Sequence, residues 1–585
     1  MRGFFKIFFA TLLALIIFVV VIVIVLIGVA GTVLSPDKPE IGSKAVLVID
    51  LGQSYKEVVQ DNPLSGLSSD EDQYDIPGLY DLVRILRHAA EDSAVRGIYL
   101  KCNSDPNGFA SNEEIRHALA DFKRHGKFIY AYGDMIPQKA YYVAGVADKI
   151  YCNPKGDVEW KGFAAEMMYL KGALDKLEIQ PQIFYAGKFK SATEPLRADR
   201  MSDANRLQLS ELLGDFYNRL LLSTAQARGL DTAVLRKCAN ENLIRHAKDA
   251  LDYKLIDGLR YDDEVKDELR DKLGVDRHAY LNFVPLGKYA KAINFKATGK
   301  DKISLIYAEG DVVDGKGDRG EIGSDTYRWL IRKARFDKDI KAILLRVNSG
   351  GGSSLASENI WRELSLARKE KPVIVSFGDV AASGAYYLSC DADSIFALPG
   401  TITGSIGVFT VIPNLQGFFK DKLGVTFDGV KTAPEADELT VTRPLTPGEK
   451  ELIQDDIDTI YHDFKMRVAN GRSKSMDYID SIAQGRVWSG TKGQALGLVD
   501  RTGTLQDAID CAARMAGTRD YRLVESPESK GFLDRLLSNY KRSVSVKAMK
   551  DEIGEDNYRT YTTLKKIRSM VGVTQARLPF ELDIE

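Results

Sequence analysis

The chain has 585 residues, 44% of them hydrophobic and 28% charged, which is typical of a globular protein with several domains. Its net charge is −2, so no basic surface is indicated and no nucleic-acid partner is predicted. The six histidines form no ligand-like pair and the cysteines no Cys-x-x-Cys, which argues against a metal site or a disulfide framework. Cys102, Cys152 and Cys390 lie in or beside apolar segments, and we predict that they are buried.

The first feature along the chain is an apolar run from Ile7 to Val33 that contains no Asp, Glu, Lys or Arg. About 20 such residues span a bilayer, whereas a cleavable signal sequence has an apolar region of only about 7–15 residues. We therefore predict a retained transmembrane helix and a linker within residues 1–40; a long signal sequence that is removed is the alternative. Arg2 and Lys6 favour an N-terminus in the cytoplasm, with the rest of the chain outside.

The rest of the chain contains two stretches with the same order of predicted elements. Each begins with an apolar strand and continues with a polar loop, a helix and a second strand, which is typical of βαβ units in a largely parallel sheet. The strand, helix and second strand are predicted at 45–51, 80–90 and 97–101 in the first stretch, and at 303–308, 326–336 and 342–347 in the second.

Sequence identities at a constant spacing connect these two stretches. Asn103–Ile150 aligns with Asn348–Ile395, and the matches include the pairs Gly133/Gly378, Asp134/Asp379 and Tyr141/Tyr386. A fixed spacing over this length indicates an internal duplication. We predict two tandem α/β domains, at about 43–290 and 300–515, followed by a charged tail at 520–585.

The second copy has a serine where the first copy has none. Ala381–Gly384, with the sequence Ala-Ala-Ser-Gly, stands where the first copy has Ile136–Lys139. We predict a strand at 372–377, a turn at 378–380 and a helical pattern from Ala381. Backbone N–H groups at such a turn stabilise a developing oxyanion beside Ser383; a helix N-cap is the alternative interpretation.

A glycine-rich loop follows the preceding strand of the same copy. Asn348–Ser353 contains three consecutive glycines, which permit positive φ and expose N–H groups that hold a negative oxygen. A tight turn is the alternative. Both motifs follow strand ends, and ligands bind at that edge of an open α/β sheet. Gly315–Gly320 matches G-x-G-x-x-G, but no helix follows it directly, so no nucleotide cofactor is predicted.

A serine nucleophile needs a base, and neither motif contains a histidine. The first half offers Lys188 and Lys190 within the segment Tyr185–Pro195. A lysine whose pKa is lowered by burial deprotonates serine; a solvated lysine pair is the alternative interpretation.

Four motifs together resemble the signal peptide peptidase A (protease IV) family in its long, duplicated bacterial form: FKSATEP at 189–195, NSGGGS at 348–353, AASGAY at 381–386 and TGSIG at 403–407. The resemblance implies two tandem Clp protease/crotonase-like domains behind one N-terminal membrane anchor, and no cofactor. It implies that Ser383 is the nucleophile, that Lys190 is the general base and that Ser405 orients Lys190. Gly384, with Gly351 or Gly352, would form the oxyanion hole.

The resemblance also implies an activity and a location. The family consists of serine endopeptidases that degrade cleaved signal peptides and other hydrophobic peptides through an acyl-enzyme. The chain would be a single-pass protein of the bacterial inner membrane, with its catalytic domains on the periplasmic side, and would form a homotetramer. One departure is Gly350, where the family usually has proline; glycine would make this loop more flexible.

The duplication predicts one active site in each chain. Gln138 stands opposite Ser383 and is no nucleophile, and Lys431, opposite Lys190, lacks the FKSATEP context. Pairing of Lys190 and Ser383 within one chain is favoured over pairing between chains. Two rival functions are a crotonase-type enzyme for acyl thioesters and a membrane scaffold without activity. The anchor disfavours the first rival, and the presence of both serine and lysine disfavours the second.

Overall fold

The structure is a computed structural model, and it describes residues 3, 8, 10–18, 21, 38–59, 74–318, 320–527 and 573–578. Most of the predicted membrane span, Ile7–Val33, lies outside the described residues. Among the described residues, no helix is both long enough and apolar enough to cross a membrane.

The first half is built on a six-stranded sheet in which every adjacent pair of strands is parallel. Its strands, in spatial order, are β6 (Gly258–Leu259), β4 (Lys149–Val158), β3 (Phe128–Ile136), β2 (Val95–Lys101), β1 (Ala45–Asp50) and β7 (Phe283–Pro285). The connecting helices are α2 (Leu79–Glu91), α3 (Phe109–Arg124) and α4 (Gln138–Ala144). Apolar side chains of these strands and helices form one buried core, so the predicted parallel sheet is confirmed.

The second half repeats this order of elements. It runs β8 (Asp301–Glu309), α12 (Ser324–Phe336), β11 (Ile340–Ser349), α13 (Ser354–Arg368), β13 (Val373–Ala382), α14 (Gly384–Ser389) and β14 (Ser394–Ala397). The sheet is completed by β15 (Ile402–Gly404), β17 (Val487–Ser489), β18 (Arg501–Thr502) and β19 (Tyr521–Ser526). The matching order of elements confirms the predicted duplication. All five cysteines are buried, as predicted for Cys102, Cys152 and Cys390.

The predicted turn at 378–380 is wrong, because β13 continues through these residues to Ala382. The first part of β13 pairs with β14, and its last part pairs with β15 from Val380↔Ile402 to Ala382↔Gly404. The new partner keeps the chain extended beyond Gly378, so the helix begins at Gly384 and not at Ala381. The tail boundary also differs, since β19 at 521–526 pairs with β8 inside the second sheet.

A third sheet combines segments from both halves and from the C-terminal tail. Its order is β10 (Glu321–Gly323), β9 (Asp311–Val313), β12 (Gly351–Ser353), β20 (Gln575–Arg577), β16 (Val408–Asn414) and β5 (Gln180–Ala186). The first half contributes β5, which pairs antiparallel with β16 from Ala186↔Val408 to Gln180↔Asn414. This pairing carries the residues after β5 out of the first half and onto the second.

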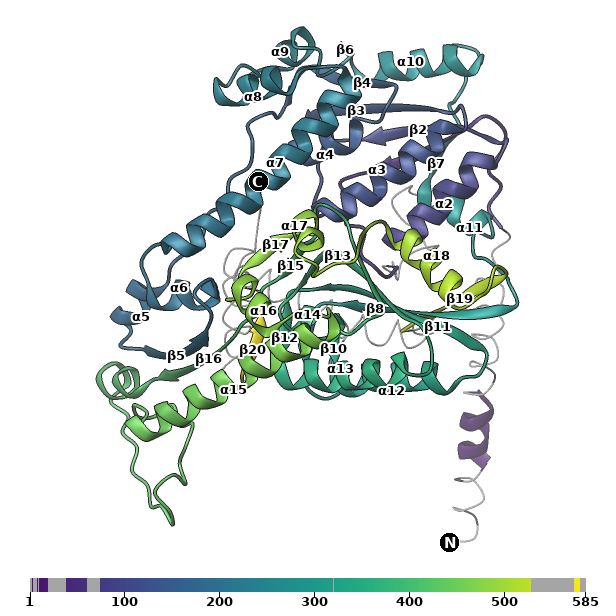
Figure 1. The fold of residues 1–585 in the computed structure, drawn as a ribbon. Coiled ribbons are helices and arrows are strands. Elements are labelled where there is room, and N and C mark those ends of the chain that lie inside the picture. The colour runs from purple at the N-terminus through teal and green to yellow at the C-terminus, as the bar shows by residue number, and fades with distance from the viewer. Residues whose placement is uncertain are drawn as a thin grey trace.

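Helix α7 (Asp203–Arg228) connects the two halves along one side (Figure 1). Its N-terminal part lies against the second half, where Glu211 pairs with Arg486 at 2.7 Å and Asp215 accepts a hydrogen bond from Ser489 at 2.7 Å. Because α7 follows the Lys190 segment in the chain, it holds that segment against the second half.

A buried cluster of charges also joins the halves. Arg346 on β11 donates to Glu57 at 3.0 Å and lies 3.0 Å from Glu114 of α3, and all three side chains are at most 3% exposed. Burial raises the pKa of Glu114, which the arginine opposes. Arg346 also donates to the Phe377 carbonyl at 2.9 Å, so the cluster supports β13, the strand that ends at Ser383.

We expect Arg346→Met to lower the free energy of unfolding by about 3–5 kcal/mol, because it leaves two carboxylates buried without their counter-charge. Urea unfolding of the variant and the parent measures the difference. Arg332→Met is the matched control: its half-exposed ion pair with Glu363 is shared with Arg335, so it should cost under about 1 kcal/mol. Equal losses in the two variants would contradict the importance of the buried cluster.

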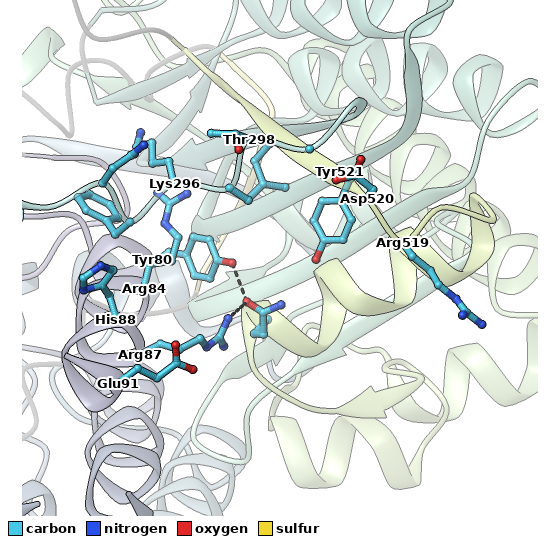
Figure 2. A pocket seen from close by; sticks show the side chains of 16 residues that line it. Tyr80, Arg84, Arg87, His88, Glu91, Lys296, Thr298, Arg519, Asp520 and Tyr521 are labelled. Carbon is cyan, nitrogen blue, oxygen red and sulfur yellow. Dashed lines mark hydrogen bonds between the residues drawn. The ribbon is translucent and has the colours of Figure 1, made fainter. Parts of the chain in front are cut away.

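A cavity of about 620 Å³ lies between the halves, lined by α2, the connecting segment 294–299 and the elements around β19 (Figure 2). Gln506 bridges it, accepting hydrogen bonds from Tyr80 at 2.7 Å and Arg87 at 3.0 Å. None of its lining residues is a predicted site residue, so this cavity is separate from the candidate active site.

Candidate active site

Lys190, Ser383 and Ser405 meet in the interior between the two halves. The Lys190 Nζ lies 2.9 Å from the Ser383 Oγ and 2.9 Å from the Ser405 Oγ, and it donates to the Ser405 carbonyl at 3.3 Å. Lys190 is 1% exposed and both serines are fully buried. The three residues that the resemblance indicated are therefore brought together, and within a single chain.

Burial changes the chemistry of the lysine. It lowers the pKa of Lys190 well below the ordinary value of 10.5, because the ammonium loses its hydration. A lysine amine held toward its neutral form has a lone pair for the Ser383 proton and N–H groups for the Ser405 oxygens. The geometry thus provides a base in contact with a hydroxyl nucleophile.

The backbone places Ser383 in an uncommon conformation between β13 and α14. Its φ is +57° and its N–H donates to the Gly404 carbonyl at 2.8 Å. Ser405 also has a positive φ, of +51°. Residues other than glycine adopt this region at a cost of about 1–3 kcal/mol. Contacts between β13 and the segment around Ser405 therefore hold both hydroxyls toward the lysine against local backbone preference.

The Lys190 segment is fixed by a loop of the second half, residues 484–486. The Phe189 N–H donates to the Gln484 carbonyl at 2.8 Å, and the Ser405 N–H donates to the Arg486 carbonyl at 2.7 Å. A Cβ added at Gly485 would lie 2.7 Å from the Lys190 Cβ, so the loop passes directly against the lysine backbone. One loop therefore sets the positions of Lys190 and Ser405 together.

Sequence reasoning missed the polar residues that support this segment from α7. Gln208, which is 1% exposed, donates to the Phe189 carbonyl and to the Ser191 Oγ, both at 3.1 Å, and accepts from the Val487 N–H. Asn205 is fully buried and donates to Glu194 at 3.0 Å. On a helix with many polar residues, nothing in the local pattern distinguishes these two amides from solvated ones.

The predicted oxyanion glycines lie next to one another beside Ser383. Gly351 has a φ of +94°, and a Cβ added there would lie 2.7 Å from the Gly384 nitrogen. A Cβ added at Gly384 would lie 3.2 Å from the Gly352 nitrogen. At Gly350, where the family usually has proline, an added Cβ would meet only the Leu578 Cβ, at 3.3 Å. This departure from the family pattern therefore does not obstruct the oxyanion glycines.

The alternative residues lie elsewhere. Lys188 is exposed, with its Nζ over the Phe189 ring, and Lys431 forms an ion pair with Asp437 at the surface. Gln138, which stands opposite Ser383, accepts hydrogen bonds from the N–H groups of residues 161 and 162, at 2.6 and 2.9 Å. The first copy thus uses this position to hold its own loop.

Comparisons with known proteins match both halves of the chain. The pattern of peptidase family S49 matches residues 121–276 and 365–519. Protease 4 of Salmonella typhi is 37% identical over 502 residues, covering 84% of this chain and 79% of that protein. Chloroplastic serine protease SPPA of Arabidopsis thaliana is 33% identical over 483 residues, 80% of this chain and 71% of that protein.

Two further similarities cover only part of the chain. A putative signal peptide peptidase SppA of Enterococcus faecium is 34% identical over 223 residues, 38% of this chain and 64% of that protein. A solved structure of a ClpP1 mutant from Listeria monocytogenes matches 35% of this chain and 94% of that chain, with 13% identity and a TM-score of 0.24.

Proposed function

The chain belongs to peptidase family S49 and is a serine protease, and from that premise we propose that Ser383 is its nucleophile, Lys190 its general base and Ser405 the residue that orients the lysine. The observation that carries this proposal is the contact of 2.9 Å between a buried lysine amine and a buried serine hydroxyl. The lowered pKa of Lys190 supports it, because only the neutral amine accepts a proton.

The reaction proceeds through an acyl-enzyme. The Ser383 Oγ attacks the peptide carbonyl carbon while its proton passes to the Lys190 Nζ. The N–H groups of Gly384 and of Gly351 or Gly352 stabilise the negative oxygen of the tetrahedral intermediate. Lys190 then protonates the leaving amine, and afterwards takes a proton from the water that hydrolyses the ester.

Substrate and location are part of the same proposal. We propose that the enzyme degrades cleaved signal peptides and other hydrophobic peptides in extended form. The apolar run Ile7–Val33 supports a single-pass anchor in the bacterial inner membrane, with the catalytic halves on the periplasmic side. Similarity to a putative signal peptide peptidase supports the substrate class. A homotetramer is proposed from the family resemblance.

The proposal is tested with the full chain in detergent, assayed on a fluorogenic hydrophobic peptide. We expect Ser383→Ala to lower kcat by at least about 10⁴-fold, as loss of a nucleophile does in other serine peptidases. Ser389→Ala is the control, because that buried hydroxyl of α14 only donates to the Ala385 carbonyl. A folded parent that cleaves no peptide would favour the scaffold, and hydrolysis of an acyl thioester alone would favour the crotonase-type enzyme.

A further inference from the structure

The buried side-chain amide of Gln208 lies between the segment that carries the general base and a strand of the second half. Its Nε2 donates to the Phe189 carbonyl, in the peptide group directly before Lys190, at 3.1 Å. Its Oε1 accepts from the Val487 N–H, at the start of β17, at 3.3 Å. This one side chain therefore joins the backbone at the lysine to the backbone of β17.

Strand β17 is in turn paired with the backbone on the other side of the lysine amine. It is antiparallel to β15, where its first residue lies opposite Gly404. The Gly404 carbonyl accepts from the Ser383 N–H at 2.8 Å, and the hydroxyl of Ser405, the next residue, lies 2.9 Å from the lysine amine. Gln208 therefore connects the base to the same stretch of backbone that holds the nucleophile and the orienting serine.

The backbone of Phe189 is held by other elements on two sides. Its N–H donates to the Gln484 carbonyl at 2.8 Å, and its carbonyl accepts from Gln208. The N–H groups of the next two residues donate to carbonyls within segment 187–191 itself, so they fold the segment without fixing its place. The amide of Gln208 is thus one of two hydrogen bonds that tie the peptide group beside the lysine to the rest of the molecule.

We propose that Gln208 is a positioning residue for the reaction, which sets the distance from the Lys190 Nζ to the hydroxyls of Ser383 and Ser405 by joining the lysine backbone to β17. It contacts none of the reacting atoms, and it acts through the lysine. This inference rests on the proposed function, because it takes Lys190 as the base. It extends the site to a residue of α7 that lies outside the four motifs of the sequence.

A small displacement of the lysine would have two consequences. A base needs a distance of about 2.6–3.2 Å to the group that it deprotonates, and a misplacement of about 1 Å costs about 10²-fold in rate. The Lys190 Nζ lies 2.9 Å from the Ser383 Oγ. Burial is the cause of the lowered pKa of Lys190, so admission of water to the amine would return that pKa toward 10.5.

The first experiment replaces Gln208 by methionine in the full chain in detergent. Methionine has a similar length but forms neither hydrogen bond of the amide. We expect kcat to fall by about 10- to 100-fold with KM changed by less than about twofold. The rise of kcat/KM with pH should move to higher pH. Gln208→Glu keeps an acceptor for the Val487 N–H but loses the donor to Phe189, and it should change both quantities in the same direction.

Gln138→Met is the matched control. Gln138 is also a buried glutamine that binds backbone N–H groups, those of residues 161 and 162 in a loop of the first half. Its replacement should lower the thermal unfolding temperature by a similar amount, because both variants leave buried backbone groups without a partner. It should leave kcat and the pH of the rise unchanged. Equal losses of kcat in the two variants, or a folded Gln208→Met with the parent's kcat and pH profile, would overturn the inference.

The second experiment tests whether Gln208 acts through the lysine. In Lys190→Met the base is absent, so addition of Gln208→Met should change the residual rate by less than about twofold. A further loss as large as that in the parent would overturn the inference and leave the proposed function standing. If Lys190→Met keeps the activity of the parent, the assignment of the base is wrong and the inference fails with it.

Discussion

Replacement of Lys190 by methionine is expected to lower kcat/KM by about 10²–10⁴-fold, the usual contribution of a general acid–base group. Methionine has an unbranched side chain that fills the same buried site, but it lacks the amine that accepts the Ser383 proton. In the parent, kcat/KM should rise with pH through the lowered pKa of Lys190 and then level off, because the neutral amine is the active form. The variant should lose this rise. Hydrolysis rates across pH, measured with full-length chains in detergent, check both results.

Stability provides a second measurement that does not depend on activity. At a pH between the lowered pKa of Lys190 and 10.5, the unfolded chain binds a proton there that the folded chain does not. The stability of the parent relative to Lys190→Met should therefore rise with pH across this window. Lys188→Met is the matched control, since Lys188 is exposed. If activity survives in Lys190→Met and is lost in Lys188→Met, the assignment of the base is wrong.

Much of the fold follows from patterns that are local in the sequence. Apolar segments such as 45–51 and 303–308 correspond to β1 and β8, and the repeat correctly indicates two halves with one order of elements. The predicted turn at 378–380 failed because pairing with β15 from Val380 to Ala382 keeps the chain extended beyond Gly378. Glycine is only a weak signal for a turn in a strand that has a pairing partner on each side.

The meeting of Lys190 with Ser383 could not be derived from local patterns alone. It depends on β5 pairing with β16, two segments separated by more than 200 residues and joined across the two halves. Strand pairing over such distances depends on tertiary packing, and the composition of either strand gives almost no information about it. The family resemblance supplied the pair of residues, and the structure supplies the reason that they meet: the third sheet, α7 and the loop at 484–486.

The C-terminal tail is a second part of the chain whose position the sequence did not predict. Its charged composition predicts a segment without a place in either domain, yet β19 belongs to the second sheet and β20 to the third. Residues 573–578 mix three apolar residues (Val573, Ala576 and Leu578) with three polar ones, and the segment pairs through its backbone with the glycines of β12. Backbone pairing of this kind leaves almost no trace in a sequence.

Replacement of Gly351 by alanine is expected to lower kcat/KM by about 10²–10³-fold, the usual cost of losing one oxyanion-hole donor. The added Cβ would lie 2.1 Å from the oxygen of Ala576, in the place where a substrate carbonyl would bind. It would also lie 2.7 Å from the Gly384 nitrogen, so the second donor would be displaced as well. Steady-state hydrolysis of a fluorogenic peptide measures the loss, which should appear mainly in kcat.

Two control variants separate this effect from general strain. Gly517→Ala introduces a Cβ at a positive φ of +68° with no neighbour within 4 Å, so it tests backbone strain alone, at about 1–3 kcal/mol. Gly350→Ala tests position, since its Cβ would meet only the Leu578 side chain. Because the catalytic contacts involve neither glycine, both controls should keep their activity at temperatures where they remain folded. If Gly350→Ala loses as much activity as Gly351→Ala, the loop as a whole is the sensitive element, and the donor at Gly351 or Gly352 has no special part in stabilising the oxyanion.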